Sequence, residues 1–141
     1  MNISFDSRFF QKNKFDKKII SKYFSNALKD FHIAAKNKKE EVIFNFSYNA
    51  LIKIGIALIA LHGHRIKSRK GHHVKILEKL SIILNDKNVG IIGDKMRRKR
   101  NLDLYEGGII ISNKEASDYL NFVKMVIQKA EKYLKSQDPL F

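Results

Sequence analysis

The stretch VIFNFSYNALIKIGIALIAL, residues 42–61, decides the fold of this chain. Its polar side chains follow one line, because Asn45, Asn49 and Lys53 are spaced at i, i+4 and i+8. The rest of the circumference is apolar, which predicts a helix over residues 39–61 at the centre of a core. The same polar side chains would be costly in the middle of a bilayer. We therefore expect a buried helix of a soluble protein rather than a membrane span.

Periodic apolar residues predict four further helices around this one. Three are expected over residues 16–36, 72–84 and 89–105. The last begins at Ser112, because Ser112 and Glu115 form a capping box in which each side chain accepts a hydrogen bond from the other residue's backbone N–H. Short connections between the helices predict an all-α, up-and-down antiparallel bundle of four to five helices.

Length and composition indicate one domain. The 141 residues suit a single domain over 1–141 with its core over 16–136, and the hydrophobic fraction of 44% is too high for a disordered chain. The chain has no Cys, which excludes disulfides, thiolate zinc sites, iron–sulfur clusters and Cys nucleophiles. Gly55 lowers helix propensity by about 1 kcal/mol relative to Ala. Its place inside the central helix predicts a second helix at very short distance.

The chain is strongly basic, because 28 Lys and Arg against 14 Asp and Glu give a net charge of +14. Positive charge concentrates in two short clusters, residues 65–70 and 95–100. Lysines interrupt residues 1–30, so no apolar block typical of a signal peptide is present there, and we expect a cytoplasmic protein. In that compartment a basic surface favours nucleic acid, nucleotides or anionic lipid as partners.

Helical spacing gathers the chemistry of the second cluster on one face. Arg97, Asn101 and Tyr105 follow one line of the predicted helix 89–105, and Arg100 lies beside them. Guanidinium groups bind phosphate oxygens through two parallel hydrogen bonds, and amide and phenol groups can contact bases. The face indicates phosphate or RNA recognition; the alternative is an exposed helix end whose cations complement the helix dipole. The predicted phosphate ligands are Arg65, Arg69, Lys70, Arg97 and Arg100.

Histidines occur in two pairs at either end of the first basic cluster, His62 with His64 and His72 with His73. Their spacing does not match a helical pair of metal ligands, and no carboxylate lies among them, so we predict no metal site. A neutral imidazole can take up a proton near pH 7. His72 or His73 is therefore a candidate general base or phosphate partner. The alternative for each is an ordinary surface histidine.

The run KMRRKRNLDLYEGG, residues 95–108, resembles the late-helix motif of the HEPN superfamily. The order of elements is similar too. FSYNAL at residues 46–51 lies on a long apolar helix, a helix start follows at residues 71–73, and the helix that contains Arg100 and Asn101 comes next. The resemblance covers residues 40–135. It implies a helical bundle, usually a homodimer, that binds RNA or nucleotides within toxin–antitoxin or defence systems, often beside a minimal nucleotidyltransferase. Active members are metal-independent endoribonucleases.

The motif of the superfamily is an Arg, a polar residue, and a His four to six positions after the Arg. Arg100 and Asn101 match the first two positions, whereas the His position falls on Tyr105, Glu106 or Gly107. In active members the Arg steadies the phosphate and the His helps to move a proton from the ribose 2′-hydroxyl. A Tyr with an ordinary pKa near 10 is a poor base at neutral pH. The resemblance implies the catalytic set Arg100, Asn101 and Tyr105, with His72 and His73 as substitutes for the His.

Three functions are compatible with these patterns. The first is a HEPN-like RNA- or nucleotide-binding protein, acting as the metal-independent endoribonuclease toxin of a toxin–antitoxin or defence system. The alternative is a catalytically inactive HEPN module that partners a nucleotidyltransferase antitoxin and holds Arg100, Asn101 and Tyr105 in a buried network. The third is non-specific DNA binding through charge, although no helix-turn-helix pattern is present. We expect a homodimer with no cofactor and no membrane association.

Overall fold

The computed structural model describes residues 2–106 and 110–141, and the side chains of 103–106 also lie outside this description. Within these ranges the chain forms five helices and one small two-stranded sheet, so the predicted all-α helical bundle is confirmed. The elements are β1 (Phe10–Lys12), α1 (Lys17–Lys36), α2 (Glu40–Leu61), β2 (His64–Ile66), α3 (His72–Ile83), α4 (Lys87–Glu106) and α5 (Asn113–Gln137).

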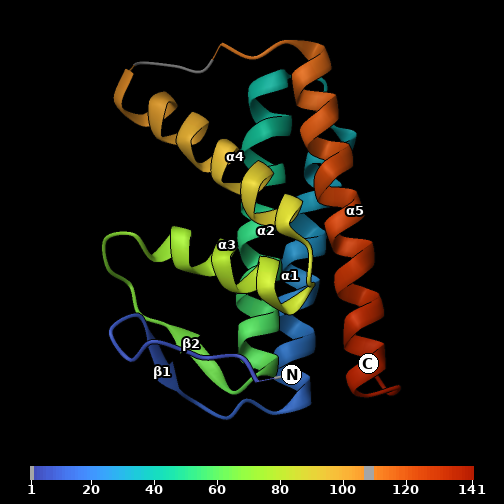
Figure 1. Ribbon diagram of the computed structural model, residues 1–141. Coiled ribbons are helices and arrows are strands. Elements are labelled where there is room, and N and C mark those ends of the chain that lie inside the picture. Colours follow the sequence, from blue (N-terminus) through green and yellow to red (C-terminus); the bar gives the residue numbers. More distant parts are fainter. Residues whose placement is uncertain (1, 107–109) are drawn as a thin grey trace.

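Three long helices form the body of the molecule. Figure 1 shows α1, α2 and α5 side by side along their lengths, whereas α3 and α4 lie across one side of α2. The predicted helix starts are confirmed at two caps. The side chain of Asp16 accepts a hydrogen bond from the Ile19 N–H at the start of α1, and the Ser112 hydroxyl accepts one from the Glu115 N–H at the start of α5.

The core is centred on α2, which contacts every other helix. By length and composition α2 could cross a membrane, with a mean hydropathy of 1.7 over its most apolar window, but 61% of that window is buried inside the molecule. Lys53, the last residue of the polar line, forms an ion pair with α1, because its Nζ lies 2.7 Å from the Asp30 carboxylate. This burial and this ion pair agree with the predicted place of α2 in the core of the molecule.

Small residues let α3 and α4 approach α2 closely. A Cβ atom on Gly55 would lie 2.4 Å from Ile76 Cγ2 of α3, which confirms the short helix–helix distance expected at this position. A Cβ atom on Gly93 of α4 would lie 2.9 Å from Leu77 Cδ2. These two glycines therefore determine how closely α3 and α4 pack on the bundle. This packing in turn places the first turn of α3 opposite the middle of α4.

The segment 62–71, which connects α2 to α3, contains the strand β2. It pairs antiparallel with β1, and Gly63 begins the strand in a left-handed conformation with φ of 74°. The phenylalanines near the N-terminus pack over α3, where Lys79 Nζ lies 5.7 Å and 5.8 Å from the ring centres of Phe5 and Phe10. The N-terminal segment thus holds the loop that leads into α3.

Candidate nucleic-acid interface

Two segments that are far apart in the sequence face each other across a hollow of about 390 Å³, which we call the basic cleft. One wall is the loop and first turn of α3, residues 68–74, and the other is the middle of α4. The cleft brings together seven of the residues predicted from the sequence: Arg69, Lys70, His72, His73, Arg97, Arg100 and Asn101. Cations, imidazoles and an amide therefore share one hollow.

The two guanidinium groups that α4 contributes to the basic cleft differ in how they are held. Arg97 Nε donates a hydrogen bond of 2.8 Å to Asp94 Oδ1, so a carboxylate neutralises part of its charge. The Arg100 guanidinium lies 5.5 Å from the ring centre of Tyr48 on α2, and no carboxylate among the described side chains pairs with it. The face of an aromatic ring orients a guanidinium and leaves its N–H groups free for an anion.

The start of α3 orients His72. Gly71 precedes the helix with φ of 83°, and no side chain caps the first turn, whose N–H groups carry partial positive charge. The Arg69 carbonyl oxygen lies 2.7 Å from His72 Nδ1. Because a carbonyl can only accept, Nδ1 is the donor, and the lone pair of the neutral ring is on Nε2. His72 is thus held in the tautomer that can accept a proton through Nε2.

His73 and Tyr48 form a second, more buried pair at the back of the cleft. His73 Nδ1 lies 2.8 Å from the Tyr48 hydroxyl oxygen. Burial lowers the pKa of His73 to about 4, and the positive charges of His72, Arg100 and Arg97 add to this lowering. Burial also raises the pKa of Tyr48 well above its usual value. Both groups are therefore neutral at pH 7, and their hydrogen bond joins α2 to α3 without an ion pair.

We expect the stability of the protein to fall as the pH is lowered from about 6.5 to about 4. In this window the unfolded chain protonates His73 and the folded chain does not, so the unfolded state binds more protons and is favoured. The loss attributable to this half-exposed group is about 1–2 kcal/mol after solvent screening. Urea unfolding of the wild type and of His73→Asn across this pH range measures it. The variant should show a smaller fall; an equal fall would contradict the assignment.

The remaining predicted cations occupy other positions. Arg69 lines the cleft, but its Nη1 donates to the Arg8 carbonyl oxygen at 2.7 Å and its guanidinium lies 5.1 Å from the Phe9 ring centre. It therefore ties the N-terminal segment to the loop, and Lys70 is exposed at the mouth. Arg65 lies on β2 and lines a separate small hollow, so the structure does not bring it to the cleft.

The other residues singled out from the sequence are Tyr105, His62 and His64. Tyr105 belongs to α4, but its side chain lies outside the described residues. In the ranges 2–102 and 110–141, no three His, Cys, Asp or Glu side chains are grouped so that they could hold a metal ion. His62 Nε2 lies 2.8 Å from the Tyr133 hydroxyl, and His64 Nδ1 donates to the His62 carbonyl oxygen at 2.9 Å. His62 and His64 thus join β2 and α5 to the end of α2.

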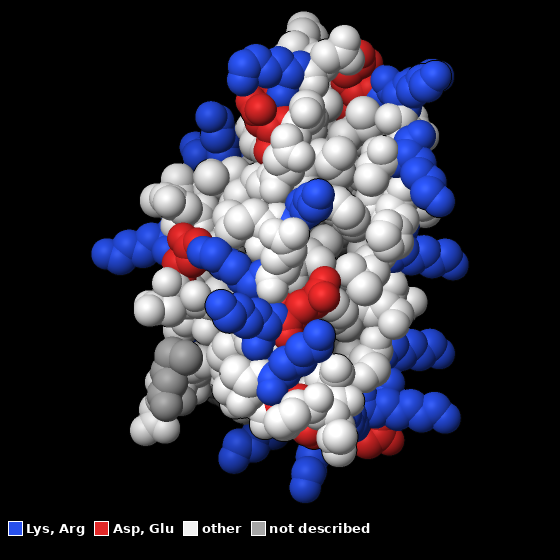
Figure 2. Space-filling model, turned by 90° about the vertical axis from the view of Figure 1, so that its right-hand side faces the viewer, with Lys and Arg blue, Asp and Glu red and all other residues white. Residues whose placement is uncertain are grey.

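Positive charge alone does not locate a site on this molecule. Figure 2 shows Lys and Arg side chains spread widely over the face on the right of Figure 1, whereas the loop before α3 lies on the left.

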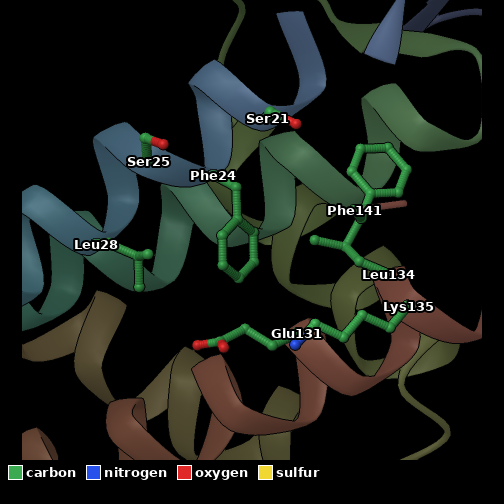
Figure 3. Close-up of a pocket in the computed structure, with 8 residues that line it drawn as sticks. All are labelled: Ser21, Phe24, Ser25, Leu28, Glu131, Leu134, Lys135 and Phe141. Atoms are coloured by element: carbon green, nitrogen blue, oxygen red, sulfur yellow. The ribbon is translucent and has the colours of Figure 1, made fainter. Parts of the chain in front are cut away.

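A separate hollow of about 300 Å³ opens between α1 and α5, where Figure 3 shows Phe24, Leu28 and Leu134 around it and Phe141 at one end. These four side chains form apolar walls, and the Glu131 carboxylate in the lining would repel a phosphate.

The chemistry of the basic cleft follows from its own side chains. No family model, curated protein or solved structure matches the chain. Arg97, Arg100 and Lys70 offer N–H donors to an anion, and Asn101 offers an amide that can both donate and accept. His72 also lines this hollow, and in its neutral form its lone pair is on Nε2. One contributor, Tyr48, could have been found as the phenol in an otherwise apolar helix, because a buried phenol requires a hydrogen-bond partner.

Proposed function

We propose that the protein binds RNA in the basic cleft and cleaves it without a metal ion, as a HEPN-like endoribonuclease. The observation that carries this proposal is that a guanidinium without a described carboxylate partner, Arg100, and an oriented imidazole, His72, line one hollow. Cleavage of a phosphodiester needs a guanidinium to stabilise the charge on the phosphoryl oxygens. It also needs a base, here the imidazole, to take the proton of the neighbouring ribose hydroxyl. Both come from side chains in the described part of the chain.

The proposed reaction is a transfer within the RNA backbone. His72 Nε2 takes the proton of the ribose 2′-hydroxyl, and the 2′-oxygen attacks the adjacent phosphorus. A bond from phosphorus to the 2′-oxygen forms, the bond from phosphorus to the 5′-oxygen breaks, and the 5′-oxygen leaves as a hydroxyl after taking a proton from water. Arg100 and Arg97 stabilise the charge that builds on the phosphoryl oxygens. The products are a 2′,3′-cyclic phosphate and a 5′-hydroxyl end.

The second candidate is a catalytically inactive HEPN module that partners a minimal nucleotidyltransferase. It is favoured by the residue at the motif position, because Tyr105 stands there in place of a His. In this function Arg100, resting on Tyr48, serves to fix α4 against α2. In both functions the protein is proposed to act as a cytoplasmic homodimer within a toxin–antitoxin or defence system.

Incubation of single-stranded RNA with the purified protein in excess EDTA tests the proposal. We expect the RNA to be shortened, with 2′,3′-cyclic phosphate and 5′-hydroxyl ends, because no step uses a metal. DNA of the same sequence should remain intact, since it lacks the 2′-hydroxyl. Binding of RNA without any cleavage would favour the inactive module. Equal binding of RNA and DNA with a steep dependence on salt would favour binding by charge alone.

A further inference from the structure

A second hollow lies on the other side of α4 from the basic cleft, and we call it the α4–α5 groove. It has a volume of about 650 Å³. Figure 1 shows that α4 slants away from α5, so that its C-terminal half stands apart from the body of the bundle. Asn101 lines both the groove and the basic cleft. The other lining residues of the groove are Lys95, Arg98, Lys99, Leu102, Glu115 and Tyr119.

The groove combines an apolar floor with a cationic rim. Leu102 is 56% exposed, and Tyr119 lies beside it in the lining with most of its surface buried. On the rim, Lys99 Nζ donates to Glu115 Oε2 at 3.1 Å. Arg98 contacts Asp94 at 3.3 Å through Nε and keeps most of its side chain in solvent. Lys95 has no carboxylate partner among the described side chains. The rim therefore carries a surplus of positive charge.

We infer that the RNA is single-stranded and crosses α4 at Asn101, so that a base one nucleotide beyond the two that flank the bound phosphodiester enters the α4–α5 groove. This inference rests on the proposed function. An unstacked base needs an apolar surface, which Leu102 and Tyr119 supply, and the backbone beside it needs cations, which Lys95 and Arg98 supply. A duplex keeps its bases paired and stacked, so it can place none of them in the groove.

The charge of the groove favours RNA over a second copy of this chain as its occupant. A second copy would bring another net charge of +14 toward the rim cations. A polyanion instead meets Lys95 and Arg98 with opposite charge. Asn101 lies where the two hollows meet, so its amide can contact the strand as it passes from one hollow to the other.

Binding of uncleavable RNA of two lengths tests this inference. A dinucleotide occupies the basic cleft alone, whereas a hexanucleotide also reaches the groove. In the double variant Arg98→Ala/Leu102→Ala, hexanucleotide affinity should fall roughly tenfold to a hundredfold, as expected for the loss of one base contact, and dinucleotide affinity should not change. Ile91→Ala is the matched control, because Ile91 is an exposed apolar residue of α4 outside both hollows.

The outcomes separate this inference from the proposed function. Unchanged hexanucleotide affinity in the double variant, or wild-type affinity for duplex RNA equal to that for a single strand, would overturn the inference alone. Failure of the wild type to bind either oligonucleotide would overturn the proposed function as well. Sedimentation of the wild type and of the double variant compares their oligomeric states. If the double variant is monomeric where the wild type is a dimer, and hexanucleotide affinity stays the same, the groove is a subunit interface and the inference is overturned.

Discussion

Replacing His72 with Gln should lower the rate of RNA cleavage by about 10²–10⁴-fold, the usual contribution of a general base, and leave the affinity for RNA unchanged. The Arg69 carbonyl fixes the proton on Nδ1, so the Nε2 lone pair of His72 is the group that can accept the 2′-hydroxyl proton. Gln keeps a polar side chain at the start of α3 but has no comparable basic nitrogen. Single-turnover cleavage in excess EDTA measures the effect.

His32→Gln is the control for this experiment, because His32 is an exposed imidazole on α1 away from the cleft. It should cleave RNA at the wild-type rate. A contaminating ribonuclease would cleave equally in every preparation, so a loss of rate confined to His72→Gln excludes one. A His72→Gln protein that cleaves as fast as the wild type would remove His72 from the mechanism. A loss of affinity equal to the loss of rate would assign it to binding instead.

The body of the fold could be predicted because its information is local. The polar line of Asn45, Asn49 and Lys53 identifies the buried helix α2, and the ion pair of Lys53 with Asp30 shows why one Lys is tolerated there. Gly55 is also a local signal. A glycine inside a helix lowers stability, so its presence indicates that a neighbouring element, here α3, packs too closely for a Cβ atom. Caps at helix starts are likewise local patterns.

The small sheet could not be predicted, because its pairing is not local. Each strand has three residues, which is too short for a periodic signal, and Phe10 pairs with Ile66 from far along the chain. This pairing also determines where the arginines of the first basic cluster, residues 65–70, lie. Arg65 lies on β2 beside another hollow, whereas Arg69 is drawn to the Arg8 carbonyl oxygen. Sequence proximity alone had grouped these two with the cleft cations.

The candidate site was predictable on one wall and not on the other. Helical spacing places Arg97, Arg100 and Asn101 on the cleft side of α4, as their sequence positions indicate. The approach of His72 and His73 depends on how α3 crosses α2, which no local pattern encodes.

Replacing Arg100 with Ala should weaken RNA binding by about 10–100-fold, because a hydrogen bond to a charged group contributes about 1.5–3 kcal/mol. No described carboxylate neutralises the Arg100 guanidinium, so its charge is available to a phosphate. The fold should be retained, since a cation–π contact is worth about 0.5–2 kcal/mol. Arg65→Ala is the matched control, with the same loss of charge at a site outside the cleft.

The most direct test of the basic cleft as the RNA site is the affinity of these two variants for uncleavable single-stranded RNA, measured side by side by fluorescence anisotropy at one salt concentration. We predict that Arg100→Ala loses most of the affinity, that Arg65→Ala keeps nearly all of it, and that urea unfolding of both resembles the wild type. Equal losses in the two variants would show that RNA senses only net charge. A large loss of stability in Arg100→Ala would show that this residue holds the bundle together rather than a phosphate.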